Sequence, residues 1–431
     1  MRTTTKWTRL LALLAGLALI AAACGDDDDT ASDDEGSDDT TAETSDDALV
    51  IGALLPESGS LSSIIGALRT PINLAVDEIN EAGGVLGSDV TVAAADDATD
   101  DSTQAQAGFD RLVNSEGIQV LLGPASSTLA EGLMDAIANN DVVACSGSNT
   151  AASLEDLEDN GHYFGFAPND NLQGPALAEV ISSDGHSNVA ILARNDTYGT
   201  GFADAVATAL QDAGINVVHN ETYDPEATSG YQSDVEALVQ SDPDAAVIIG
   251  FSDDGGAIVS QMIEQGVGPD SLPIYTGDGM KGSSFWETVG EDPSLVEGIK
   301  GTAPAAAPAG VEHPFYDAYA ETGEDTIFSA YFYDCAIASA LAAQSADSLA
   351  ADDIADAMLE VTADGTECQT FAECKDLLDE GEDIDYQGAS GDLTLNDDGH
   401  VLSGAYDVWA YDAEGADTTL DEPQIVIDRT E

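Results

Sequence analysis

The chain has 431 residues, enough for two domains with substantial hydrophobic cores. It carries 83 acidic residues against 10 basic ones, which gives a formal net charge of -73. Because so few cations cannot neutralise phosphates, the charge excludes nucleic acid as a partner and argues against arginine clamps for phosphates or dicarboxylates. The acidic excess is spread along the whole chain, as in proteins from saline habitats, where salt screens the repulsion between like charges.

Residues 1–23 have the pattern of a targeting segment. A basic start and an apolar run at 10–20 precede Ala-Ala-Ala-Cys at 21–24, which is similar to a lipoprotein cleavage box. The apolar run is short for a membrane-spanning helix. We therefore expect cleavage before Cys24, whose lipid would anchor the mature chain to the cell membrane. A plain secretory signal with a chance cysteine is the alternative.

Residues 24–47 consist, after Cys24, almost entirely of Asp, Glu, Ser, Thr, Gly and Ala. Such a segment cannot bury enough apolar surface to fold. We predict an acidic disordered tether, which its like charges keep extended.

From residue 48 onward, apolar runs typical of buried strands alternate with segments of helical periodicity. Strands are expected at 48–55, 89–95, 118–123, 142–145 and 163–167. Helices are expected between them, around 68–79, at 100–115 and at 127–140. Pro71 lies within the first helical pattern and predicts either a kink or a restart with Thr70 as the N-cap. This alternation predicts a mostly parallel, doubly wound sheet.

Pro168-Asn169-Asp170 interrupts the alternation, which then starts again and predicts a second lobe. Its strands are expected at 189–193, 215–221, 245–250, 273–276 and 299–303, and its helices at 172–182, 201–213, 231–240 and 256–265. Residues 304–308 form a second crossover. Helices near 315–320, 329–343 and 352–361 follow, and residues 391–409 alternate as a hairpin.

These elements predict two α/β lobes joined by a hinge with chain crossovers. The first would contain residues 48–167 with about 304–387, and the second 168–303 with about 388–431. Clefts between such lobes are common ligand sites.

Two short loops each follow a predicted strand and precede a helical pattern: Gly-Pro-Ala-Ser-Ser-Thr at 123–128 and Ser-Gly-Ser-Asn-Thr at 146–150. In open α/β sheets, ligands bind at the carboxyl ends of the strands, and helix N-termini there favour an anion. We interpret the two loops as a cradle of backbone N–H and hydroxyl donors for the carboxylate of a small molecule. Two ordinary N-capped turns are the alternative.

Besides Cys24 the chain has four cysteines, an even number that suggests disulfides outside the cytoplasm. Cys368 and Cys374 lie close together in a loop-like stretch, which favours a local bridge. A pairing of Cys145 with Cys335 stays open. The spacing of cysteines and histidines indicates no metal site, and we expect no cofactor.

Several short stretches together carry a resemblance to a known family. They are the two loops and residues 75–87, 96–100, 173–175, 196–199 and 277–279. The sequence resembles the type I periplasmic solute-binding proteins of the leucine/isoleucine/valine-binding kind, which are the receptors of ABC importers. The resemblance covers nearly the whole chain from about residue 48. It implies ligand binding without catalysis, between lobes that close by a hinge motion.

The resemblance also implies roles for individual residues. Those that match ligand carboxylate contacts are Ser127, Ser148 and Thr150. Tyr198 matches a contact to the ligand's polar end, and Asp278 matches the acceptor of an α-ammonium. Further pocket positions are Phe251 or Ser252, Phe328, and Ile64, near which the family often has an aromatic residue. The chemistry agrees, because a buried carboxylate needs several donors and a buried ammonium needs an acidic acceptor.

We therefore expect a lipid-anchored, extracytoplasmic and monomeric binding protein of an ABC importer. It would capture an amino acid, branched-chain or similarly apolar, and deliver it to the transmembrane permease subunits. The same fold could instead bind an amide, urea or an aromatic carboxylate, or serve as a ligand-sensing receptor subunit.

A third alternative is an extracellular hydrolase that uses the Asp96-Asp97 pair, or Cys145 as nucleophile. Adjacent residues on a strand face opposite ways, and Cys145 has only His162 near it in sequence. We therefore expect no enzyme.

Overall fold

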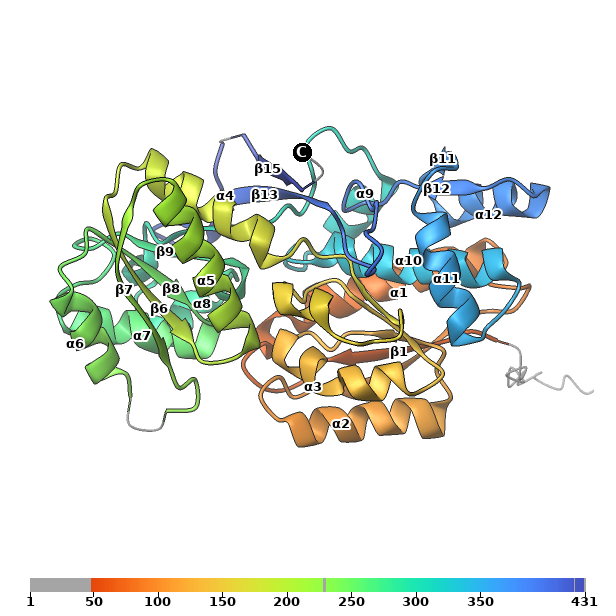
Figure 1. The fold of residues 1–431 in the computed structure, drawn as a ribbon, viewed down its shortest axis with the longest axis horizontal. Coiled ribbons are helices and arrows are strands. Elements are labelled where there is room, and N and C mark those ends of the chain that lie inside the picture. Colours follow the sequence, from red (N-terminus) through yellow and green to blue (C-terminus); the bar gives the residue numbers. More distant parts are fainter. Residues whose placement is uncertain (1–47, 228–229, 422, 430–431) are drawn as a thin grey trace, which may run out of the picture. The chain divides into compact units, whose positions relative to one another are not determined.

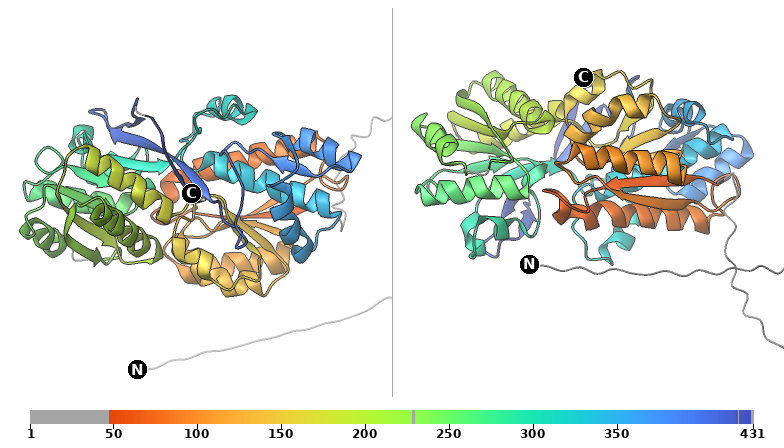
Figure 2. Two further views of the ribbon diagram at one scale, coloured as in Figure 1. Left: turned by 45° about the horizontal axis from the view of Figure 1, so that its top comes forward. Right: turned by 90° about the horizontal axis from the view of Figure 1, so that it is seen from below.

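We describe a computed structural model of the chain, which covers residues 48–227, 230–421 and 423–429. The predicted targeting segment, the predicted lipid anchor at Cys24 and the predicted acidic tether lie outside these residues. The described chain forms two large β-sheets with helices packed against them, and one small two-stranded sheet (Figures 1 and 2). No helix in the described ranges is both long enough and apolar enough to cross a bilayer.

The first sheet is entirely parallel, with the strand order β2-β1-β3-β4-β5. Its strands are β1 (Val50–Leu55), β2 (Thr91–Asp96), β3 (Val120–Leu122), β4 (Val143–Ser146) and β5 (Tyr163–Gly165). The connecting helices are α1 (Ile65–Glu81), α2 (Ser102–Arg111) and α3 (Ser127–Ala138). Because the strands are parallel, their carboxyl ends gather at one edge of the sheet, which brings the two donor loops together there.

The second sheet has the strand order β14-β13-β10-β9-β8-β6-β7, and β15 also pairs with β13. Its strands are β6 (Asn188–Arg194), β7 (Asn216–Tyr223), β8 (Ala245–Ile249), β9 (Ile274–Thr276), β10 (Lys300–Pro304), β13 (Ser403–Tyr411), β14 (Asp417–Thr419) and β15 (Ile425–Asp428). Its helices are α4 (Asp170–Ser183), α5 (Thr197–Asp212), α6 (Gln232–Gln240), α7 (Ser252–Glu264) and α8 (Phe285–Val289). The strands from β6 to β10 are parallel, whereas β13 runs antiparallel to β10.

After β10 the chain returns to the first sheet. The elements of this return are α9 (Pro314–Ala320), α10 (Ser329–Ala346), α11 (Ala351–Val361), α12 (Phe371–Glu380) and the short parallel strands β11 (Thr366–Cys368) and β12 (Ile384–Tyr386). Helix α10 packs on α1 and α11, and its side chains are buried on every face from Ser329 to Ala343 (Figure 1). A helix that is apolar all round is a core helix.

Both cysteine pairs form disulfides. Cys145 at the end of β4 is joined to Cys335 in α10, and Cys368 at the end of β11 is joined to Cys374 in α12. The stretch that carries the second pair is not a loop, as predicted, but a strand followed by a helix. Thr370 caps that helix by accepting a hydrogen bond from the N–H of Glu373.

The predicted fold class is confirmed, with two corrections. Helix α1 begins at Ile65 and contains Pro71, so the predicted restart is wrong; the first turns bury Ala67 and Leu68, which offsets the hydrogen bond that the proline removes. Residues 391–409 are not a simple hairpin. One antiparallel bridge joins Leu395 and Val401, and β13 then pairs with β10, β14 and β15. The predicted lobe boundaries stay a prediction.

Candidate ligand-binding site

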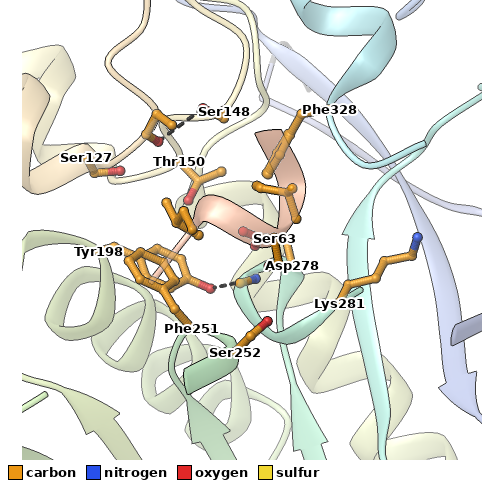
Figure 3. A pocket seen from close by; sticks show the side chains of 14 residues that line it. Ser63, Ser127, Ser148, Thr150, Tyr198, Phe251, Ser252, Asp278, Lys281 and Phe328 are labelled. Carbon is orange, nitrogen blue, oxygen red and sulfur yellow. Dashed lines mark hydrogen bonds between the residues drawn. The ribbon is translucent and has the colours of Figure 1, made fainter. Parts of the chain in front are cut away.

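A pocket lies where loops from the two sheets meet (Figure 3). The space between its lining atoms, including the part that opens to solvent, is about 460 Å³. The side chains that line it are those of Leu61, Ser63, Ile64, Ala125, Ser127, Ser148, Thr150, Tyr198, Phe251, Ser252, Asp278, Gly279, Lys281 and Phe328.

One wall of the pocket consists of hydroxyl groups from the two donor loops. Ser127 is the first residue of α3, and its Oγ accepts a hydrogen bond from the N–H of Ala151 at 3.3 Å, which leaves its own proton available to a ligand. The Ser148 hydroxyl donates a hydrogen bond to the carbonyl oxygen of Ala125 at 3.0 Å. The same hydroxyl can accept a hydrogen bond from a ligand, or rotate and donate one to it. Thr150 is buried beside them. These groups, at the N-terminus of a twelve-residue helix, suit a carboxylate.

Asp97 holds the first donor loop in shape from behind. Its carboxylate accepts hydrogen bonds from the N–H groups of Ala125, at 2.9 Å, and Thr99, at 2.8 Å. Burial raises the pKa of Asp97 to about 7, against these two opposing hydrogen bonds. At Gly123, φ is +101°, and a Cβ would lie 2.2 Å from the carbonyl oxygen of Leu54, so only glycine fits. The hydrogen bonds of Asp97 and the requirement for glycine at position 123 therefore fix the conformation of this loop.

The opposite wall is acidic and aromatic. Asp278 follows β9, and its side chain is only 6% exposed. Burial raises its pKa to about 6, while Gln173 and the Tyr198 hydroxyl oppose the rise. Tyr198 lies in the first turn of α5, and its hydroxyl accepts a hydrogen bond from the N–H of Gly279 at 3.4 Å (Figure 3). Its ring stacks on Phe251, with 5.4 Å between the ring centroids.

Sequence reasoning missed Asp170, a second buried carboxyl next to Asp278. It is the first residue of α4 and 0% exposed, and neither of its oxygens has a hydrogen-bond partner among the described residues. Burial raises its pKa well above the ordinary value, and the Asp278 carboxylate raises it further. The sequence showed this residue only as part of a crossover. An acidic residue directly after Pro-Asn at the lobe junction was the available signal.

The remaining side of the pocket is apolar. Leu61, Ile64, Phe251 and Phe328 line it, and each is at least nine-tenths buried. Phe328 has φ of +59°, a conformation that residues other than glycine rarely adopt, and it caps α10. Lys281 also contributes to the lining, but its ammonium pairs with Asp417 at 3.0 Å and points away from the other labelled side chains (Figure 3).

The arrangement can hold a small zwitterion. Its hydroxyl donors suit an anionic group, the buried Asp278 carboxyl suits a cationic group, and the apolar side suits a hydrocarbon group. The described residues contain no cluster of three or more His, Cys, Asp or Glu side chains placed to bind a metal.

A family model described as "Periplasmic binding protein" matches residues 48–403. The chain belongs to this family. The recognition made from the sequence is therefore confirmed, and the match covers the whole first sheet, the second sheet as far as the start of β13, and every residue that lines the pocket.

Two curated relatives give this membership more detail. The chain is 28% identical over 247 residues to the Leu/Ile/Val-binding protein BraC3 of Rhizobium johnstonii, an alignment that covers 57% of this chain and 65% of the relative, slightly less than two thirds. It is 24% identical over 358 residues to the chemotactic signal transduction system substrate-binding protein BasB of Halobacterium salinarum, covering 80% of this chain and 83% of the relative.

A solved structure shows the same fold. The branched-chain amino acid transporter substrate-binding protein LivJ of Streptococcus pneumoniae, in complex with isoleucine, superposes with a TM-score of 0.71 at 23% identity. The superposition covers 88% of this chain and 99% of that chain.

The structure brings all the predicted site residues into one pocket. They are Ile64, Ser127, Ser148, Thr150, Tyr198, Phe251, Ser252, Asp278 and Phe328. Their individual roles stay predictions.

The residues proposed for a hydrolase are engaged elsewhere. The Cys145 sulfur is in a disulfide, and His162 contacts Asp352 at 3.0 Å. Asp96 accepts hydrogen bonds from Ser58, Ala98 and Gln104, while Asp97 holds the donor loop.

Proposed function

We propose that this chain is the extracytoplasmic binding protein of an ABC importer that captures an α-amino acid with an apolar side chain. The observation that carries the proposal is the pairing of hydroxyl donors on one wall with the buried Asp278 carboxyl on the other, beside an apolar end. A free α-amino acid carries a group for each of these three features: a carboxylate, an ammonium and an apolar side chain.

Charge supports an amino acid over the other small ligands. In this proposal Asp278 accepts the α-ammonium, and Asp170 is a second buried carboxyl near Asp278. A simple carboxylic acid or a benzoate-like ligand would leave the Asp278 carboxylate without a cation, and a buried unpaired charge is costly. An amide or urea would lack the anion that the hydroxyl wall suits. A zwitterion satisfies both walls at no net charge.

The side-chain end supports an apolar group. Its contacts would come from Leu61, Ile64, Phe251 and Phe328, and the nearest cation, Lys281, is already paired with Asp417. A charged ligand side chain would find no free partner among these residues. The name of the relative from Rhizobium johnstonii, a Leu/Ile/Val-binding protein, agrees with this choice.

Membership in a periplasmic binding protein family supports an extracytoplasmic location. The lipid anchor at Cys24, the delivery to transmembrane permease subunits and the monomeric state belong to the proposal. One relative is named as a substrate-binding protein of a chemotactic system, which favours a ligand-sensing receptor subunit as the second candidate. The two candidates share the ligand and differ in the partner. Deletion of the gene should abolish uptake of the labelled amino acid in the first case and taxis toward it in the second.

A thermal-shift panel tests the ligand. Residues 48–431 in high salt would be mixed with L-isoleucine, L-leucine, L-valine, their amides, their deaminated acids, urea and benzoate. A ligand that binds only the folded state raises the unfolding midpoint. We expect a rise with the amino acids and none with the amides or acids. A rise with an acid or amide alone would remove Asp278 from the ammonium role and overturn the proposal.

A further inference from the structure

Arg194 has an exceptional place among the basic residues of this chain. Each of the seven arginines and lysines in the described ranges forms an ion pair, and six of them pair with a single carboxylate residue. Arg194, at the end of β6 and only 2% exposed, pairs with three: Asp100, Asp196 and Asp254. Three carboxylates around one guanidinium need a physical explanation in a protein with so many acidic and so few basic residues.

The guanidinium uses each nitrogen for a different carboxylate. Nε donates to Asp196, Nη1 to Asp254 at 3.0 Å and Nη2 to Asp100 at 3.0 Å. Its flat face covers the ring of Phe251, 3.7 Å from the ring centroid. A lysine ammonium is a point charge and could not serve three separated acceptors and a ring face together.

Two of these carboxylates hold the aromatic wall of the pocket. Asp196 caps α5 by accepting a hydrogen bond from the N–H of Gly199 at 2.8 Å, beside Tyr198. A Cβ on Gly199 would lie 2.2 Å from the carbonyl oxygen of Arg194, so the first turn of α5 packs directly on this residue. Asp254 accepts from the N–H of Phe251 at 3.3 Å. Arg194 thus supports the two stacked rings from behind.

The third carboxylate comes from the first sheet. Asp100 follows β2, and its other oxygen accepts hydrogen bonds from the Oγ of Ser60 at 2.7 Å and from its N–H at 3.3 Å. Ser60 directly precedes Leu61, which lines the pocket together with Ser63. Asp196 and Asp254 already provide two negative charges for the single cation, so Asp100 is not needed to neutralise Arg194. What Asp100 adds is a connection between the two sheets at the pocket.

We propose that Arg194 is a positioning residue of this site. It fixes the wall formed by Tyr198 and Phe251, and its ion pair with Asp100 latches the loop that carries Leu61 and Ser63 onto that wall. The effect on ligand release rests on the proposed function, since it requires an amino acid in the pocket. The latch itself rests on the contacts of Arg194. Thr197 also joins elements of the two sheets, through hydrogen bonds to Thr128 and Glu131.

The test compares the full chain with its Asp100→Asn variant, and L-isoleucine is the probe. Asparagine keeps the size and an acceptor oxygen but loses the charge, and Arg194 keeps two carboxylates, so the variant should fold. Asp77→Asn is the matched control, since Asp77 is an exposed carboxylate on α1. We expect isoleucine to dissociate about three- to thirtyfold faster from Asp100→Asn, with the association rate and the ligand-free unfolding midpoint unchanged. The control should behave as wild type.

Hydrogen exchange separates failure of the latch from failure of the proposed function. Amides of residues 57–63 should exchange faster in ligand-free Asp100→Asn than in wild type or Asp77→Asn, whether or not isoleucine binds. Faster exchange in Asp100→Asn, together with a wild-type protein that binds no isoleucine, would support the latch and refute the proposed amino acid ligand. Unchanged exchange overturns the latch. A fall in the unfolding midpoint that accounts for the faster dissociation also overturns it, because Asp100 would then be merely structural.

Discussion

Replacing Asp278 with asparagine should stabilise the ligand-free protein. The substitution keeps the shape of the side chain and removes a buried charge. Burial raises the pKa of Asp278 from 3.8 to about 6, and this difference corresponds to about 3 kcal/mol. The folded state binds this proton more tightly than the unfolded chain does. At a pH below its ordinary pKa of 3.8, the protonated carboxyl therefore contributes to the stability of the fold, and this contribution is lost as the pH rises through about 6. At pH 8 the variant should unfold at a higher temperature.

The same substitution should weaken amino acid binding severely. The ligand ammonium would lose its charged acceptor, a loss of about 2–5 kcal/mol for a desolvated pair, or about thirtyfold to several thousandfold in affinity. Calorimetric titration with L-isoleucine and thermal unfolding in one buffer at pH 8 would measure both effects, with Asp77→Asn as the control for charge. Wild-type affinity in Asp278→Asn would refute the ammonium role. A lowered midpoint would refute the reasoning from burial.

Three further predictions concern the pocket and its support. Affinity for an α-amino acid should fall by up to about tenfold per pH unit as the pH drops through about 6, because the ammonium and a proton compete for Asp278. Any dependence that persists in Asp278→Asn would come from the other buried carboxyls, Asp97 and Asp170, and a flat wild-type titration from pH 5 to 8 would contradict the competition. Ser127→Ala should weaken binding by about 1.5–3 kcal/mol in isothermal titration, because a hydroxyl donor to a carboxylate is lost; equal affinity would remove Ser127 from the site. Changing Cys145 and Cys335 together to alanine should lower the free energy of unfolding by about 2–5 kcal/mol in urea titrations, because the bridge spans 190 residues; unchanged stability would show that packing of α10 suffices without the bridge.

The donor loops and Asp278 were predictable because their chemistry is local. Each sits directly after an apolar strand, and parallel strands bring such positions to one edge of a sheet. Ser127 and Ser148 could be assigned to one cradle from that rule and from the family resemblance. The contacts that orient them, such as that between Asp97 and Ala125, are invisible at the level of strand and helix patterns.

The residues that the sequence did not reveal depend on contacts between distant segments. Asp170 reads as part of a Pro-Asn-Asp turn, and only the packing of the crossover beneath the pocket makes it a buried carboxyl beside Asp278. Arg194 was one of a few scattered cations, and its partners Asp100 and Asp254 lie far from it along the chain. Helix α12 was missed because its charged surface resembles a loop, although Phe371 and Cys374 are spaced to face the core.

The order of the elements along the chain has a consequence for biosynthesis. The core of the first sheet includes α10, and the second sheet needs β13, yet both follow β10 in sequence. A nascent chain that has emerged only as far as β10 therefore holds a first sheet that lacks α10 and a second sheet that lacks β13. Phe328, which lines the pocket and directly precedes α10, is also still missing at that point. A premature stop codon before β13 would therefore leave a second sheet without β13, β14 and β15, although every residue that lines the pocket had been synthesised.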